Sequence, residues 1–360
     1  DFHFSVNRKM QDEVVGAMCR EVEIQKGYFS SLETKTNLDS IYFGGGTPSL
    51  LTQEQLKKLL ERIHLYFSVN PNAEINLEAN PDDITQEKVA FWKANGINRL
   101  SIGIQSFREQ DLKWMNRAHN AQEASQAANI AKEGGIHDLS LDLIYGIPGL
   151  SKEDWIKNIY KALEYNPSHL SCYALTVEEN TPLFKLIHTK RSPAPIDENT
   201  ARHFNSLMEV MEKEGWEHYE ISNFCKKGHR AVHNSNYWNG VPYLGIGPSA
   251  HSYNGFSRQW NLNNNKEYLS ALNNNQVPFE KEILSQKDKV NEYILVALRT
   301  SNGCDIKRIL EIDPLAVANI SVDIAPYLEN GMVTMENEVI QLTKEGKHMA
   351  DRIASDLFVE

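Results

Sequence analysis

Four segments of this sequence read as buried strands that each end on a polar residue: residues 41–47, 74–78, 100–105 and 139–143. Side chains alternate between the two faces of a strand, so the face opposite the apolar one carries Glu78, Gln105 and Asp142. A buried carboxylate or amide is costly without a partner. The repetition from strand to strand therefore predicts one shared polar site at a common end of a sheet.

Each of these polar residues has a structural interpretation beside the functional one. Glu78 could simply pair with Arg99 or Arg117, and its two counterparts could be satisfied in the same way. An inward carboxylate can equally bind an ammonium group or ribose hydroxyls. Three such residues on one rim favour a ligand site.

A glycine-rich turn, Gly-Gly-Gly-Thr-Pro-Ser at residues 44–49, directly follows the first of these strands. Glycine lets backbone N–H groups approach a ligand closely, as in anion-binding nests. The spacing matches neither GxGxxG nor the P-loop pattern GxxxxGK[ST]. The triplet alone is typical of a tight turn, but beside Glu78 and Gln105 it favours a ligand contact.

Two later segments gather histidines, amides and aromatic residues. Residues 233–238 read His-Asn-Ser-Asn-Tyr-Trp, and residues 243–253 bring several glycines before His251. An imidazole beside aromatic side chains suits a metal or a flat macrocycle, although a histidine near aromatics is more often a satisfied structural residue. His233 is the stronger of the two ligand candidates and His251 the weaker.

The elements that must position these residues alternate between strand and helix up to about residue 176. The pattern predicts helices at about 12–29, from 52, at 86–95, 109–115 and 121–134, and from 151, with a last strand at 169–176. Such alternation implies a parallel sheet with right-handed crossovers. Five visible strands, with a sixth expected before Asp1, favour an α/β fold built on a partial TIM-type (β/α)6 barrel, in which the chemistry lies at the C-terminal strand ends.

The sequence divides into three parts, residues 1–180, 181–275 and 276–360. The first is the barrel and the second extends it, ending in an Asn-rich stretch, 261–275, that reads as a connection. The third is mostly helical with one hairpin at 332–342, an arrangement that resembles a winged-helix domain. Its charges are acidic or mixed, which favours a packing role over DNA binding.

Composition narrows the class of protein. The 360 residues carry a formal net charge of −11, which argues against nonspecific nucleic-acid binding. No apolar run approaches the roughly 20 residues that span a bilayer. The four cysteines are widely spaced without a CxxC pair, which suits a reducing compartment and predicts a cytoplasmic protein: Cys19, Cys172, Cys225 and Cys304.

Six segments, taken in order and at their separations, resemble the HemN/HemW branch of the radical S-adenosylmethionine (radical SAM) enzymes over essentially the whole chain. They are GGGTPS (44–49), EANP (78–81), GIQSF (103–107), NRAH (116–119), DLIYGIPG (142–149) and GIGPSAHSY (245–253). The resemblance implies a partial barrel that holds a 4Fe-4S cluster and S-adenosylmethionine. It implies nine cofactor-binding residues: Gly45, Gly46 and Thr47 at the methionine end, Glu78, Gln105, Arg117 and Asp142 around the rest of the cofactor, and Ala174 and His251 near the adenine.

The sequence departs from this family at the cluster motif. Members carry CxxxCxxC on the first barrel loop, with an Asp/Asn-Phe pair soon after the third cysteine, whereas this sequence has no such motif and begins Asp1-Phe2. We therefore expect the cluster cysteines just upstream of Asp1 and no metal ligands within the chain. Without that loop the cluster could not be built.

Within the branch, Asp1-Phe2 and the HNxxYW pattern at 233–238 resemble the HemW type. Proteins of this type are regarded as haem chaperones, which implies haem at His233 and haem-accepting proteins as partners. The alternative is the HemN-type reaction, oxidative decarboxylation of two propionates of coproporphyrinogen III to protoporphyrinogen IX. Nucleic-acid binding by the C-terminal part is a minor alternative. The resemblance leaves open whether the chain is an enzyme and whether it associates peripherally with membranes.

Overall fold

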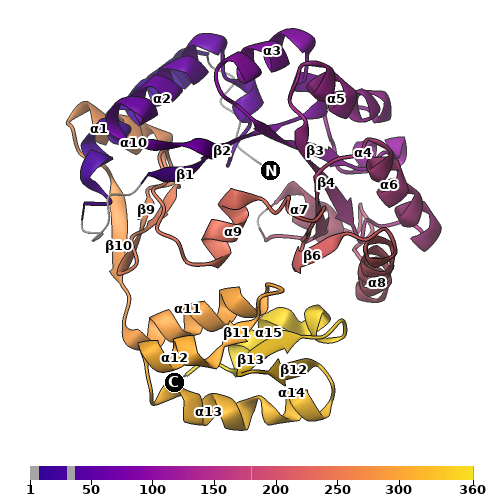
Figure 1. Cartoon of the computed structure of the whole chain (residues 1–360). Helices are drawn as coiled ribbons and strands as arrows, with labels where there is room; N and C mark the ends of the chain where they lie inside the picture. The colour runs from indigo at the N-terminus through magenta and orange to yellow at the C-terminus, as the bar shows by residue number, and fades with distance from the viewer. Residues whose placement is uncertain (1–7, 31–36, 180, 360) are drawn as a thin grey trace.

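The structure, a computed structural model, describes residues 8–30, 37–179 and 181–359 of the chain. The expectation that rests on Asp1-Phe2 lies outside the described residues. Within them, the largest feature is a seven-stranded sheet that curls into a half-barrel, with helices along its outer, convex side (Figure 1).

The half-barrel confirms the partial barrel predicted from the sequence. Its strands run in the spatial order β1 (Leu38–Phe43), β2 (Val69–Ala79), β3 (Arg99–Gln105), β4 (Asp138–Tyr145), β5 (His169–Ala174), β7 (Asn223–Cys225), β6 (Glu217–Glu220). The first five are parallel, as the strand–helix alternation predicted. Strands β7 and β6 add an antiparallel extension beyond β5 that the sequence did not predict.

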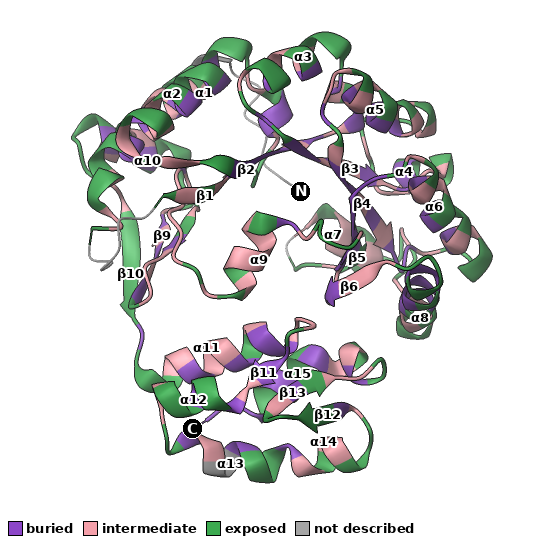
Figure 2. Cartoon of the chain, in the orientation of Figure 1, coloured by how far each residue is buried: buried purple, intermediate pink, exposed green. Residues whose placement is uncertain are grey.

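Most helices of the half-barrel bury their apolar faces against the sheet, as Figure 2 shows. They are α2 (Gln53–Tyr66), α3 (Gln86–Ala94), α4 (Glu109–Trp114), α5 (Ala121–Glu133), α6 (Lys152–Glu164) and α8 (Asp197–Lys213). Helix α1 (Arg8–Ile24) packs instead against α2 and the later helix α10 (Asn265–Asn273), and α7 (Pro182–His188) has no buried residue. Helix α2, predicted to begin at residue 52, opens with a capping box of Thr52 and Gln55. This outer layer leaves the polar residues of the strands on the inner, concave side.

One short helix, α9 (Val232–Trp238), lies on the concave side of the half-barrel (Figure 1). It carries His233 into contact with β1. Beside it, β8 (His251–Tyr253), β9 (Ser257–Asn261) and β10 (Phe279–Ile283) form a second, antiparallel sheet.

The stretch 261–275 is not the plain connection that its asparagines suggested. It contains helix α10 (Asn265–Asn273), because the Asn264 side chain accepts hydrogen bonds from the N–H groups of Lys266 and Glu267 and so caps the helix. Tyr268 and Leu272 of α10 are fully buried. Asparagine is typical of loops, but here one of these residues serves as an N-cap.

The C-terminal segment, residues 286–359, has a cluster of buried apolar residues of its own. Its elements are α11 (Gln286–Leu298), β11 (Cys304–Asp305), α12 (Ile306–Ile312), α13 (Ala316–Asp323), α14 (Ala325–Glu329), β12 (Val333–Glu336), β13 (Val339–Leu342), a 3-10 turn η4 (Gly346–Met349) and α15 (Ala350–Asp356). The β12–β13 hairpin confirms the predicted one, and Asn337 and Glu338 turn it with positive φ angles of 52° and 67°. No helix within the described ranges is both long enough and apolar enough to span a bilayer.

Candidate functional site

Glu78 occupies the inner side of the half-barrel where β2 ends beside the glycine turn. Its carboxylate accepts a 2.6 Å hydrogen bond from the Tyr42 hydroxyl and another from the Gly45 N–H group. Burial raises the pKa of Glu78, and these two hydrogen bonds oppose that rise. The structural alternative, a pairing of Glu78 with Arg99 or Arg117, is not found, because neither guanidinium forms an ion pair with it among the described residues.

The glycine turn is shaped by this pair. A Cβ atom on Gly44 would lie 2.4 Å from Tyr42 Cε1 and 2.8 Å from Glu78 Oε1, so only glycine fits there. Gly45 has a φ of +77°, the left-handed region that favours glycine, and Gly46 has no atom within 4 Å of an added Cβ. Thr47 follows as the N-cap residue of a short 3-10 turn, without a side-chain capping bond. The turn therefore presents open backbone beside a buried carboxylate.

Gln105 and Arg117 meet over Gly103, one strand away. A Cβ atom on Gly103 would lie 2.8 Å from Gln105 Nε2, 3.6 Å from Arg117 Nη2 and 3.8 Å from Asn80 Oδ1. Arg117 donates one 2.8 Å hydrogen bond to Asn80, while its Nε atom is buried without a hydrogen-bond partner among the described residues. Burial lowers the pKa of Arg117. A buried guanidinium atom without a partner is the kind of group that an anionic ligand would satisfy.

Asp142 completes the set on β4. It accepts a 3.2 Å hydrogen bond from Ser140 and a further hydrogen bond from Ser171. Burial and, after it, the nearby charge of Glu78 raise its pKa to about 7, although the hydrogen bonds from Ser171 and Ser140 oppose the rise. Glu78 and Asp142 therefore share the interior of the half-barrel, as the alternation of the strands predicted. We call Gly45, Glu78, Gln105, Arg117 and Asp142 the rim site.

The donors and acceptors of the rim site fit S-adenosylmethionine. The Arg117 guanidinium and the open glycine backbone suit a carboxylate, whereas the oxygens of Glu78 and Asp142 suit an ammonium group or ribose hydroxyls. No ligand set for an iron–sulfur cluster was found in the part of the chain that the structure describes, where no three His, Cys, Asp or Glu side chains group to hold a metal. All four cysteines are free and buried.

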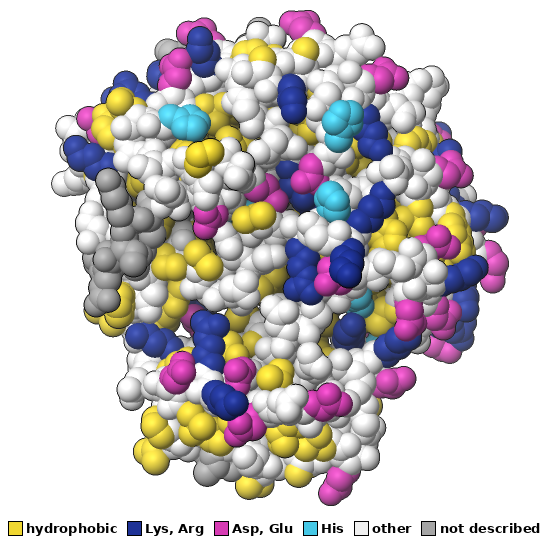
Figure 3. All heavy atoms as spheres, in the orientation of Figure 1, with side chains coloured by type: hydrophobic (Ala, Val, Ile, Leu, Met, Phe, Trp, Pro, Cys, Tyr) yellow, Lys and Arg dark blue, Asp and Glu magenta, His cyan; other side chains and the backbone are white. Residues whose placement is uncertain are grey.

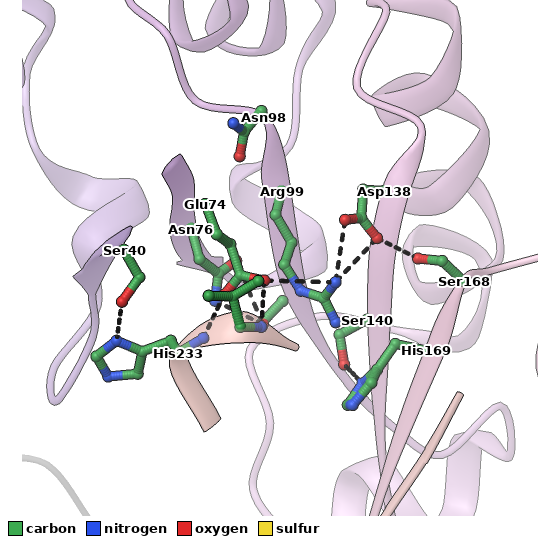
Figure 4. A network of polar contacts seen from close by, with 12 residues as sticks. Ser40, Glu74, Asn76, Asn98, Arg99, Asp138, Ser140, Ser168, His169 and His233 are labelled. Carbon is green, nitrogen blue, oxygen red and sulfur yellow. Dashed lines mark hydrogen bonds and ion pairs between the residues drawn. The ribbon is translucent and has the colours of Figure 1, made fainter. Parts of the chain in front are cut away.

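His233, on α9, lies next to the rim site, with Tyr42 in contact with both His233 and Glu78. Its Nδ1 atom is 3.0 Å from Ser40 Oγ, and its ring stacks on Tyr42 with a centroid distance of 4.5 Å and an interplanar angle of 22°. The Glu74 carboxylate accepts hydrogen bonds from the backbone N–H groups of Val232 and His233, at 2.8 and 3.0 Å, and so holds the start of α9 (Figure 4). Burial lowers the pKa of His233 to about 4, which keeps the imidazole neutral at pH 7.

A buried polar network behind the rim site was not predicted from the sequence. Arg99, almost fully buried, pairs with Asp138 at 2.9 Å and lies 3.8 Å from Glu74 (Figure 4). His169 Nδ1 is 2.7 Å from Ser140 Oγ, and its Nε2 atom is 2.8 Å from the Tyr219 hydroxyl. The alternation of side chains along the strands, which predicted the inward position of Glu78, also places these side chains inward. A search for inward polar residues along whole strands, rather than at strand ends, would have found them.

Two predicted residues, Ala174 and His251, remain apart from the rim site in the contacts described. Ala174 ends β5 and is exposed. His251 begins β8, is exposed, and stacks on Trp260 at 6.2 Å. The segment before β8 is fixed to α1 instead, because the buried Glu21 carboxylate accepts a 2.8 Å hydrogen bond from the Gly247 N–H group. The role of both residues at an adenine stays a prediction.

In the space-filling view of this face, acidic, basic and histidine side chains gather over the middle of the half-barrel (Figure 3). Hydrophobic side chains are prominent instead along the outer edge of the C-terminal segment.

Comparison with known proteins agrees with this arrangement. Residues 30–159 match the radical SAM superfamily. The solved structure titled coproporphyrinogen III oxidase (HemN) from Escherichia coli, a radical SAM enzyme, superposes with a TM-score of 0.83 over 99% of this chain and 85% of that one, at 22% identity. That likeness shows the fold.

The sequence relatives identify the branch. The heme chaperone HemW of Bacillus subtilis is 33% identical over 320 residues, which cover 88% of this chain and 84% of that protein. The heme chaperone HemW of Escherichia coli is 36% identical over 67% of this chain and 61% of that protein. At this identity and coverage, the chain belongs to the HemW family of the radical SAM superfamily.

Proposed function

We propose that this chain is a haem chaperone, which binds haem and delivers it to haem-dependent proteins. The relatives named heme chaperone HemW support this function, since they match most of the chain. The proposal includes the cytoplasmic location that the unpaired cysteines suggested and the three-part division of the chain at residues 180 and 275. Haem-accepting proteins are the partners, and nucleic acid is not among them.

The observation that carries the proposal is the environment of His233. Ser40 engages Nδ1, and the low pKa leaves the imidazole neutral. In the tautomer whose Nδ1–H group donates to Ser40 Oγ, Nε2 has the free lone pair for the iron of haem. The second ring nitrogen of a metal-binding histidine is commonly fixed by a hydrogen bond in this way. Ser40 would therefore hold the ring orientation.

The rim site would hold S-adenosylmethionine. Gly45, Gly46 and Thr47 would contact its methionine end. Arg117, whose Nε atom has no hydrogen-bond partner among the described residues, would contact the rest of the cofactor. When bound, the cofactor and a 4Fe-4S cluster would supply one-electron chemistry. Glu78, Gln105 and Asp142 would also surround the rest of the cofactor. Ala174 and His251 would lie near the adenine.

The test is a haem titration followed by the Soret absorption. His233→Ala should weaken haem affinity by about tenfold or more, because it removes the coordinating nitrogen. His229→Ala is the matched control, since His229 is an exposed histidine that precedes α9. Equal haem affinity in His233→Ala and the wild type would contradict the assignment.

The enzyme alternative has its own test. Reconstituted protein that carries the cluster would be incubated with coproporphyrinogen III, and protoporphyrinogen IX would be measured. Transfer of haem to an apo-haemoprotein without such conversion is the expected result. Turnover of coproporphyrinogen III would replace the chaperone proposal with the HemN-type reaction.

A further inference from the structure

Tyr42 contacts both the rim site and the candidate haem ligand. Its hydroxyl donates the 2.6 Å hydrogen bond to Glu78 Oε1, and its ring stacks on His233 at 4.5 Å. The Nδ1 atom of the same ring lies 3.0 Å from Ser40 Oγ. The imidazole is therefore held by a hydrogen bond at Nδ1 and by stacking on the Tyr42 ring.

The position of Tyr42 depends closely on Glu78. The phenol is partly buried on the inner side of the half-barrel, where a hydroxyl without an acceptor is costly. Glu78 is the one acceptor within hydrogen-bond distance of this hydroxyl among the described residues. The absence of a Cβ atom on Gly44 brings the two side chains together, since such an atom would collide with both.

A ligand at the rim site would compete for the same carboxylate. An ammonium group or a ribose hydroxyl that donates to Glu78 needs the carboxylate oxygens that now accept hydrogen bonds from the Tyr42 hydroxyl and the Gly45 N–H group. Tyr42 must then share the carboxylate or turn, and a turn of the phenol changes its stacking on His233. Tyr42 would then have two orientations. A ligand shifts the balance between them only by the difference in its affinity for the two.

We infer that Tyr42 is a positioning residue. It couples the occupancy of Glu78, whether its carboxylate is engaged by a rim-site ligand or only by Tyr42, to the orientation in which His233 binds haem. The inference rests on the proposed haem site, and it adds that a ligand at the rim site regulates haem binding there. Coupling is reciprocal, so haem bound at His233 alters the affinity of the rim site by the same factor. The two sites are thus linked through one aromatic side chain.

A double-mutant cycle on haem affinity tests the coupling. The proteins are the full-chain wild type, Glu78→Ala, Tyr42→Phe and the double variant, each titrated with ferric haem. Removing the acceptor in Glu78→Ala should change the haem dissociation constant by about fivefold or more and shift the Soret band. In the Tyr42→Phe background, the same substitution should change it by less than about twofold.

Two further variants separate coupling from general damage to the fold. Glu78→Gln keeps an acceptor oxygen for Tyr42 and should restore haem affinity to within about twofold of the wild type. Tyr145→Phe is the matched control, because Tyr145 is a buried tyrosine of β4 that stacks on Phe204, and it should leave the cycle unchanged. Should Glu78→Ala not fold, adding S-adenosylmethionine to the wild type and to Tyr42→Phe makes the same comparison without it.

The outcomes are distinct. A Glu78→Ala effect that disappears in the Tyr42→Phe background supports the inference. An effect of equal size in both backgrounds, or no effect in the wild-type background, overturns it while the haem site stands. Unchanged haem binding in His233→Ala removes the proposed haem site itself.

Discussion

The fold raises the pKa of the Asp142 carboxyl group to about 7, so that its protonated and ionised forms coexist near neutral pH. Burial is the main cause of its raised pKa, and the charge of Glu78 adds to it. Serine hydroxyls on β4 and β5 partly offset the effect. Such a group is poised to bind a ligand donor once the ligand compensates its ionised form.

The pKa of Asp142 predicts how stability changes with pH. The folded chain holds a proton, up to about pH 7, that the unfolded chain releases near pH 3.8, so the free energy of unfolding falls as pH rises through this window. Asp142→Asn removes the penalty. We expect the variant to be more stable than the wild type by roughly 2–4 kcal/mol at pH 8, with the difference vanishing below pH 4.

Urea denaturation of ligand-free protein across this pH range measures the difference. Asp138→Asn serves as the control, because the Asp138 carboxylate pairs with the buried Arg99 and its loss should destabilise the protein at neutral pH. A constant stability difference between Asp142→Asn and the wild type from pH 4 to pH 8 would contradict the raised pKa.

At the scale of elements, α9 is held on the concave side of the half-barrel mainly by polar contacts from strands. Glu74 binds its first two N–H groups, and Ser40 binds the His233 ring. None of the seven residues of α9 is fully buried. The helix has little apolar burial to hold it, so its position depends on these hydrogen bonds.

Glu74→Ala should therefore loosen α9 without unfolding the half-barrel. Two hydrogen bonds to a charged acceptor are lost, each contributing about 1.5–3 kcal/mol. We expect hydrogen exchange at the Val232 and His233 amides to accelerate by about tenfold or more, while the amides of α5 keep their rates.

Glu54→Ala, at an exposed glutamate in the first turn of α2, is the control and should leave α9 unchanged. Native exchange rates at α9 in Glu74→Ala would mean that other contacts hold the helix. Exchange measured by mass spectrometry on peptides that cover residues 228–240 gives the required resolution.

The sequence predicted much of the fold and about half of the site, for physical reasons. Glu78, Gln105 and Asp142 were predictable because strand periodicity is local and puts them on one face. The Tyr42–His233 stack was not, because the two residues are brought together only by the tertiary fold. Strand β7 was missed because three residues, Asn223–Cys225, are too few to show alternation.

On the scale of the whole molecule, the C-terminal segment packs against the antiparallel end of the half-barrel. Lys347 of η4 reaches His218 of β6, with Nζ 2.9 Å from Nδ1. Burial lowers the pKa of Lys347 to about 8 and that of His218 to about 3. The contact therefore joins an amine and an imidazole that are both costly to charge.

Lys347 makes the stability of this contact depend on pH. The unfolded chain binds a proton at Lys347 up to about pH 10.5, whereas the folded chain releases it near pH 8, so stability rises with pH through this window. Lys347→Met removes the cost of burying the charge. We expect it to be more stable than the wild type at pH 7 by roughly 1–3 kcal/mol, allowing for partial exposure, with less difference at pH 10.

Thermal unfolding at the two pH values measures this effect. Lys344→Met is the matched control, since Lys344 is exposed and its pairing with Glu212 should contribute less than about 1 kcal/mol. A loss of stability at pH 7 in Lys347→Met would show that the hydrogen bond to His218 outweighs the buried charge.

The separation in sequence between β1 and α9 has a consequence for biosynthesis. Ser40 and His233 are 193 positions apart, and Glu74 binds an N–H group 159 positions later. As the chain leaves the ribosome, β1 is complete long before α9 has been translated. During that time Ser40 and Tyr42 have no contact with His233. Contacts this distant also close late in folding. A nascent chain thus lacks the proposed haem site until translation has passed residue 233.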